Sequence, residues 1–170
     1  MRRQGPSAAE GFLLAMAPRL RGYVRVLLAN AADAEDVLQE TFLGYLKGGP
    51  GAGTPNAERW LFRVARNRAL NLLRDEARRR RREAARPEPA PRPAPDPAGQ
   101  AELSEAARRI EACLAQVPLE AREMLYLKVA EDLSLSEIAE RTGTPKSTVA
   151  LRLQEGLILL NRLFRGGGPP

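Results

Sequence analysis

The feature that most constrains this 170-residue chain is a run of alternating prolines, PEPAPRPAPDP, over residues 87–97. Each proline fixes its own φ, removes a backbone donor and biases the preceding residue to extended geometry. The run therefore predicts a polyproline II segment of about 34 Å, at about 3.1 Å per residue. We expect two domains, over residues 1–86 and 101–170, with residues 87–100 as a stiff linker. A disordered insert with no spacing role is the alternative for such a composition.

The charge of the chain is concentrated before this linker. Residues 1–86 hold 17 Lys and Arg against 9 Asp and Glu, a net charge of +8, whereas residues 101–170 hold 9 against 10, a net charge of −1. A basic surface attracts a polyanionic partner such as nucleic acid. The single Trp, three Tyr and four Phe are too few to form a stacking platform for single strands.

The composition also excludes several classes of function. The chain has no His, and Cys113 is its single cysteine, which excludes a disulfide framework and a Cys-rich zinc site and argues against most hydrolytic chemistry. The residues support no enzyme, and we expect neither a cofactor nor a metal. The apolar runs are far shorter than the roughly 18 to 20 residues that a bilayer requires, and the N-terminus is a poor signal peptide. We expect a cytoplasmic protein with no membrane span.

Helical periodicity without any strand pattern predicts an all-α fold, with an N-terminal helical bundle and a C-terminal helix-turn-helix. The capping box Ser7-Ala-Ala-Glu10 opens a first helix that Pro18 is expected to interrupt or restart. Asp33 is expected to cap a second helix, which runs to Lys47 and stops at the glycines of residues 48–49.

A Gly/Pro-rich loop over residues 48–56, expected to be mobile, separates the second helix from a long third helix. Asn56 is expected to cap this third helix, which runs into the arginines of residues 78–82. After the linker, residues 101–117 are amphipathic through Leu103, Ala107, Ile110 and Leu114. Pro118 is expected in the first turn of the next helix, and the last two helices open at a capping box over residues 134–137 and at Thr144-Pro145.

The strongest motif is SEIAERTGTPKSTV, over residues 136–149. A helix-turn-helix needs a small residue where its helices cross, a left-handed residue in the turn and a branched core residue in the second helix. Ala139, Gly143 and Val149 stand at those positions. The sequence therefore predicts a DNA-binding helix-turn-helix, and a helical hairpin with no DNA role is the alternative.

The long third helix has two contrasting faces. At 100° per residue its core face carries Leu61, Ala65, Ala69 and Leu72. Its outward face carries Trp60, Arg63, Asn67, Asn71, Arg74 and Arg78. Asn can read base edges, Arg can hold phosphates and an indole can stack on a base, so this face suits nucleic acid. The alternative is an ordinary solvated face with Trp60 packed on a neighbour, and the arginines of residues 78–82 carry no sequence information.

The second helix presents carboxylates around an exposed leucine. Its predicted core stripe is Ala34, Leu38, Phe42 and Tyr45. Asp36, Glu40 and Leu43 then face outward, with Gln39 at the margin, as in a docking face for a basic partner helix. A solvated acidic face is the alternative, and a metal site at Asp36 and Glu40 has no further ligand nearby to complete it.

Three segments together resemble a family. These are DAEDVLQETF at residues 33–42, WLFRVARNRALNLLR at residues 60–74, and LAQVP at residues 114–118 leading into the helix-turn-helix. In this order they are similar to the bacterial RNA polymerase sigma factors of the extracytoplasmic function group, within the sigma-70 family. The resemblance covers nearly the whole chain except the linker, the glycine loop and the tails.

The resemblance implies a role for each segment. Asp36, Gln39 and Glu40 fall where the family contacts the beta-prime clamp of core RNA polymerase, in agreement with the docking face that also includes Leu43. The loop of residues 48–56, with Asn67 and Asn71, falls where the family captures flipped bases of the minus-ten promoter element. The linker falls where the family passes through the polymerase between its two promoter-binding domains.

The second helix of the helix-turn-helix departs from the family, because Ala150 and Glu155 replace residues that are commonly basic. Its outward face carries Leu151, Gln154, Glu155, Ile158 and Arg162. We expect either an atypical minus-35 readout, a helical protein partner such as an anti-sigma factor or an activator, or a degenerate surface. The residues expected to lead the minus-35 readout are Lys146, Ser147, Thr148 and Arg152.

The sequence thus predicts a sigma factor that binds core RNA polymerase and directs promoter recognition and melting. The alternative is a sigma-like adaptor or interaction protein that has reduced or lost minus-35 readout and whose last helix binds a protein partner. A helix-turn-helix repressor acting alone is weaker, because the domain that would read DNA is the acidic one.

Overall fold

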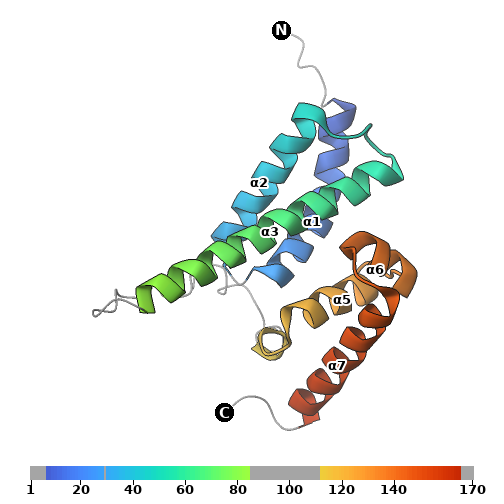
Figure 1. Cartoon of the computed structure of the whole chain (residues 1–170). Coiled ribbons are helices and arrows are strands. Elements are labelled where there is room, and N and C mark those ends of the chain that lie inside the picture. The colour runs from blue at the N-terminus through green and yellow to red at the C-terminus, as the bar shows by residue number, and fades with distance from the viewer. Residues whose placement is uncertain (1–6, 29, 85–111, 166–170) are drawn as a thin grey trace. The chain divides into compact units, whose positions relative to one another are not determined.

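The computed structural model describes residues 7–28, 30–84 and 112–165, and all regular structure within these ranges is helical (Figure 1). The chain divides into two compact units, residues 1–95 and 96–170. The predicted linker and most of the amphipathic segment before Pro118, including Leu103, Ala107 and Ile110, lie outside the described residues. The all-α prediction is confirmed.

The first unit is a bundle of three helices, α1 (Ala8–Leu27), α2 (Ala31–Gly48) and α3 (Pro55–Ala84), each packed on the other two. Its core is built from large side chains of all three helices. Tyr23 of α1 and Phe62 of α3 are fully buried, with ring centroids 5.1 Å apart. Leu20, Leu38 and Leu61, one from each helix, are also fully buried in this core.

Pro18 does not interrupt α1, contrary to the sequence prediction, because the helix runs through it from the Ser7 capping box to Leu27. A proline removes one helical hydrogen bond, the bond to the carbonyl of Leu14. Both Pro18 and Leu14 are exposed, so water can reach that carbonyl. The packing of Leu20 and Tyr23 on the other side of Pro18 holds the two halves of the helix in line.

The ends of α2 and α3 differ from the predicted ones by a few residues. Asn30, and not Asp33, caps α2, since its side-chain oxygen accepts from the backbone N–H groups of Ala32 and Asp33. Helix α2 includes Gly48 and ends at the C-cap Gly49. Likewise Thr54, and not Asn56, caps α3, because its hydroxyl accepts from the N–H of Ala57 at 3.2 Å and Pro55 then occupies the first helical position.

The last two turns of α3 extend beyond the core. The buried residues of α3 end at Ala69, and every residue from Ala77 to Ala84 is exposed. Two predicted core positions also lie at the margin, since Leu72 of α3 and Phe42 of α2 are only half-buried. Local ion pairs join Arg80 to Glu76 and Arg79 to Glu83 in this segment.

The second unit packs α5 (Leu119–Val129), α6 (Leu135–Thr142) and α7 (Lys146–Arg165) around Met124, Leu127, Ile138 and Val149. Pro118 is the N-cap of α5 and not a residue of its first turn. The Ser134 capping box that opens α6 is confirmed. Gly156 of α7 is buried against α5, where an added Cβ would lie 2.8 Å from Leu125 Cδ1 and 3.3 Å from Ala121 Cβ.

Candidate protein-docking and nucleic-acid surfaces

The predicted docking face of α2 is a continuous exposed surface. Capping by Asn30 and burial of Leu38 and Tyr45 set the rotation of the helix. The side chains turned away from the core are Asp36, Gln39, Glu40 and Leu43, all exposed, so Gln39 is more accessible than predicted. Leu46, which the sequence analysis did not single out, is also 52% exposed and extends the apolar part of the face next to Leu43, at 56%.

Asp33, in the first turn of α2, lies among charged side chains of both α2 and α3. Desolvation by burial raises the pKa of Asp33 above its usual value, and the nearby carboxylates of Glu76 and Asp36 raise it further, while Arg79 opposes the shift. These neighbours show that the N-terminal turns of α2 lie close to the C-terminal half of α3. The first turn of α2 therefore interacts electrostatically with the C-terminal half of α3.

Glu40 is not a solitary surface carboxylate. It accepts a charge-assisted hydrogen bond from Nη1 of Arg68, one residue beyond Asn67 on α3. Among the described residues, no group of three or more candidate ligands could hold a metal ion.

Trp60 does not stand free on the outward face of α3. Its ring packs edge-on against Tyr45 of α2, with ring centroids 5.7 Å apart. The indole also lies over Gly44, where a Cβ added to the glycine would be 3.6 Å from Cη2 of Trp60. The side chain is half-buried. The alternative in which Trp60 packs on a neighbour is therefore the one observed, and the remaining outward face begins at Arg63.

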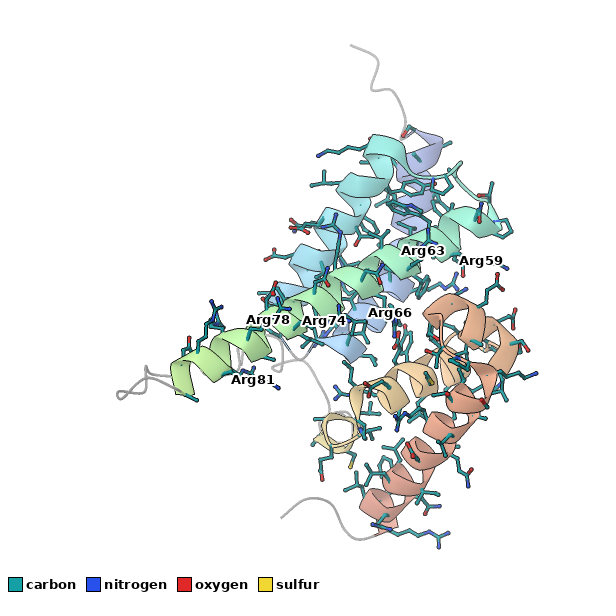
Figure 2. The ribbon with its side chains drawn as sticks, in the orientation of Figure 1. Arg59, Arg63, Arg66, Arg74, Arg78 and Arg81 are labelled. Atoms are coloured by element: carbon teal, nitrogen blue, oxygen red, sulfur yellow. The ribbon has the colours of Figure 1, made fainter. Side chains whose placement is uncertain are left out.

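The other predicted residues of the nucleic-acid face are exposed along α3, and Figure 2 shows several of its arginines following the helix. The exposed side chains in question are those of Arg63, Asn67, Asn71, Arg74 and Arg78. Arg74 donates to Oδ1 of Asn71 at 3.3 Å, which orients the amide, and Arg78 lies 3.7 Å from Asp75. An oriented amide flanked by guanidinium groups can read a base edge while cations hold the backbone.

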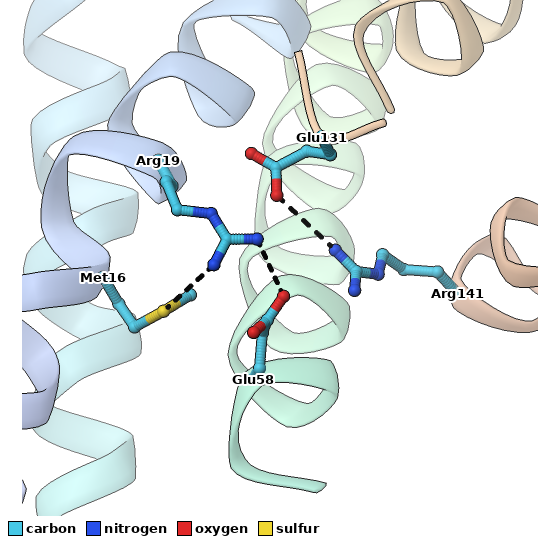
Figure 3. A network of polar contacts seen from close by, with 5 residues as sticks. All are labelled: Met16, Arg19, Glu58, Glu131 and Arg141. Carbon is cyan, nitrogen blue, oxygen red and sulfur yellow. Dashed lines mark hydrogen bonds and ion pairs between the residues drawn. The ribbon is translucent and has the colours of Figure 1, made fainter. Parts of the chain in front are cut away.

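Each unit also contains an ion pair between residues that are distant in the sequence. In the first unit Arg19 of α1 donates to Glu58 of α3 at 2.8 Å, and its other terminal nitrogen lies 3.7 Å from the sulfur of Met16 (Figure 3). In the second unit Glu131 lies 3.9 Å from Arg141 of α6. The Arg19–Glu58 pair ties the first turn of α3 to α1 and so helps to position the outward face.

The helix-turn-helix geometry that the sequence predicts is present. Gly143 adopts a left-handed conformation, with φ 68°, between α6 and α7, and Val149 is fully buried. Ala139 lies half-buried where the helices meet. Lys146 and Ser147 are exposed at the start of α7, and Thr148 is half-exposed one residue later.

The outward face of α7 combines an internal ion pair with apolar side chains. Arg152 donates to Glu155 at 2.9 Å, and this hydrogen bond is the main reason that the pKa of Arg152 is raised. Leu151 and Ile158 are 52% and 54% exposed on the same face. The cation expected to contact DNA is thus already paired within the helix, and two apolar side chains flank the pair.

Comparisons with known proteins match both units. The Sigma-70 region 2 family model matches residues 12–79, and the Sigma-70, region 4 model matches residues 107–160. The ECF RNA polymerase sigma factor EcfG of Rhodopseudomonas palustris (strain TIE-1) is 30% identical over 156 residues, which cover 89% of this chain and 82% of EcfG. The chain belongs to the extracytoplasmic function group of the sigma-70 family.

Further relatives of this sigma factor agree with that assignment. The RNA polymerase sigma factor CarQ of Myxococcus xanthus is 30% identical over 163 residues, covering 92% of this chain and 89% of CarQ. The sigma factor RpoE from Bartonella quintana, solved in complex with the anti-sigma factor NepR, matches with a TM-score of 0.69 at 22% identity. That match covers 90% of this chain and 94% of RpoE and shows a shared fold.

The family assignment establishes the general role of the chain. It is a sigma factor, a transcription regulator that binds RNA polymerase and recognises promoters. Because regions 2 and 4 both match, the alternative of a sigma-like adaptor is not favoured. Of the helices described within residues 7–28, 30–84 and 112–165, none combines the length and apolarity needed to cross a membrane.

Proposed function

We propose that the first unit divides the work of this sigma factor between two adjacent helices. The docking face of α2, formed by Asp36, Gln39, Glu40 and Leu43, binds the beta-prime clamp of core RNA polymerase. The outward face of α3 binds the minus-ten element, through Arg63, Asn67, Asn71, Arg74 and Arg78. Trp60, packed on Tyr45, supports the N-terminal end of this face. The observation that supports this assignment most directly is the exposure of two chemically opposite faces on neighbouring helices of one rigid core.

Melting follows from the chemistry of the α3 face. Extruding a base from the stack costs a few kcal/mol, so a surface that rewards only an extruded base couples recognition to strand opening. Asn67 and Asn71 supply amides that can pair with a base edge, and the surrounding arginines hold the phosphates on either side. The loop before α3, which the left-handed Gly53 and the Thr54 cap shape, borders the same region.

The remaining proposals concern the organisation of the chain. Residues 1–86 and 101–170 act as the region 2-like and region 4-like domains, joined by the Pro-rich linker of residues 87–100. The second domain contributes a minus-35 contact through Lys146, Ser147, Thr148 and Arg152, and the outward face of α7 is also suited to an anti-sigma factor or activator. The chain works in the cytoplasm as a binding subunit and has no catalytic step of its own.

In vitro transcription with core RNA polymerase on fragments of the source genome tests the proposal. We expect defined start sites that depend on addition of the chain. Asp36→Arg combined with Glu40→Arg should abolish them by reversing the charge of the docking face. Asp75→Arg combined with Glu83→Arg makes the same change of charge on α3, outside the docking face, and should leave binding to core polymerase intact. Transcription that is insensitive to the first pair of substitutions would contradict the proposed docking face.

A further inference from the structure

Arg68 spans the space between the two faces of the first unit. Its backbone belongs to α3, between Asn67 and the buried Ala69, but its guanidinium lies over α2. Nη1 donates to Glu40, and Nη2 lies 3.7 Å from the position that a Cβ of Gly44 would occupy. The absence of a side chain at Gly44 leaves room for the guanidinium beside the indole of Trp60.

The pose of Arg68 is held mainly by Glu40. Its Nε is buried and, within the described residues, has no hydrogen-bond partner. An unsatisfied buried N–H costs free energy, so the pose is stable only while the carboxylate compensates for it. The side chains of Arg68 and Glu40 are 37% and 62% exposed, so an incoming group can reach the pair from solvent.

We propose that Glu40 keeps Arg68 away from DNA in the free sigma factor and that docking on polymerase releases it. This inference rests on the proposed docking role of Glu40. A basic side chain of the polymerase that takes the Glu40 carboxylate competes with Arg68 for the same oxygens. Arg68 then turns to a DNA phosphate next to Asn67 and Asn71, where its Nε and one terminal nitrogen can both donate.

The release makes polymerase binding and DNA binding favour each other. Docking adds one cation to the nucleic-acid face, and a phosphate that captures Arg68 leaves Glu40 open to the polymerase. Such coupling is reciprocal by thermodynamic necessity, so the factor by which polymerase raises DNA affinity equals the factor by which DNA raises polymerase affinity. An exposed ion pair supports a factor of about two to five.

The first test is the affinity of the full chain for core polymerase, measured by titration of fluorescently labelled sigma factor without DNA. If polymerase must displace Arg68 from Glu40, Arg68→Gln should tighten binding by about two- to fivefold. If Arg68 merely presents Glu40 to its partner, the same substitution weakens binding, and that result overturns the proposal. Circular dichroism of Arg68→Gln checks that the bundle retains its helicity.

The second test is the affinity of the free full chain for a fluorescein-labelled oligothymidylate of 20 nucleotides, across a series of salt concentrations. Glu40→Gln releases Arg68 and should tighten binding about two- to fivefold, with a salt slope steeper by about 0.7, the value for one added phosphate contact on a single strand. Glu10→Gln removes the same charge from α1, outside both proposed binding faces, where glutamine can keep the capping box, and its slope should equal that of the unmodified chain.

The double variant Glu40→Gln with Arg68→Gln decides between release and simple loss of charge. We expect it to bind the oligonucleotide no more tightly than Arg68→Gln alone. An equal gain from Glu40→Gln with and without Arg68 overturns the proposal while leaving the proposed function intact. Failure of every variant to bind at low salt contradicts the nucleic-acid face itself, and this distinguishes a failure of the proposed function from a failure of the coupling.

Discussion

The ion pair on α7 leads to a quantitative prediction about duplex binding. Arg152 is the one arginine among the residues proposed for minus-35 contact, and Glu155 holds it at 2.9 Å, with both side chains less than half exposed. Replacing Glu155 by Gln frees this guanidinium without adding a charge of its own. Each cation that reaches a phosphate of duplex DNA steepens the slope of log K against log salt by about 0.9, so we expect that increment from Glu155→Gln.

The combination of Ala150→Arg with Glu155→Arg should steepen the slope of log K against log salt further than Glu155→Gln does. Both positions are exposed on α7. If the two new arginines reach phosphates, the slope steepens by about 1.8, and it steepens by about 2.7 if the freed Arg152 contributes as well. Affinity should rise most at low salt, where the release of counterions is most favourable.

Fluorescence anisotropy with a labelled duplex, using the full chain and at least four salt concentrations, measures these slopes. Asp132→Asn is the matched control, because it removes the same charge from an exposed position of the second unit and asparagine tolerates the positive φ there. The reasoning is refuted if Glu155→Gln and Asp132→Asn give the same slope. It is also refuted if the unmodified α7 surface already supports specific duplex binding near 10⁻⁸ M, as expected of an efficient reader.

Two further predictions separate base reading from phosphate binding and test the packing of the second unit. Asn71→Ala should reduce promoter opening and relax the base preference at one position. Neutralising the arginines of residues 79–81 should instead weaken binding to all sequences and flatten the salt dependence of binding in the same titration. Equal losses of affinity on all sequences for both changes would mean that α3 reads no bases. Gly156→Ala should lower the free energy of unfolding by about 1 to 3 kcal/mol in urea denaturation, because its Cβ would press on Leu125, while Gly11→Ala in open space on α1 should not destabilise the chain.

The helices and their faces could be predicted because they depend on local patterns. The two capping boxes and the turn at Gly143 need only a few neighbouring residues, and all three are present. Cap positions are harder to predict, because several residues near each helix end can accept from the same N–H groups. Asn30 precedes Asp33 and Thr54 precedes Asn56, and in both cases the earlier residue closes the first turn.

The errors and omissions concern contacts between helices. Pro18 breaks a helix only when the lost hydrogen bond is not offset, and packing through Leu20 provides that offset. Trp60 shares its helical face with Asn67, but the packing of α2 decides that it contacts Tyr45. The approach of α5 at Gly156 and the pairing of Arg68 with Glu40 join residues 28 or more positions apart, so no local pattern could indicate them.

The exposed end of α3 gives the proposed DNA-binding helix a gradient of local stability. Residues 77–84 have no buried side chain, and a helical segment of this length is marginal in water without tertiary packing. Its amide hydrogens should therefore exchange with solvent through local fraying, while those near Leu61 and Ala65 exchange only when the core opens. DNA that orders the frayed turns must offset the conformational entropy that they lose. Because these turns are not packed on the core, their arginines can follow the path of a phosphate backbone without disturbing the buried N-terminal half of α3.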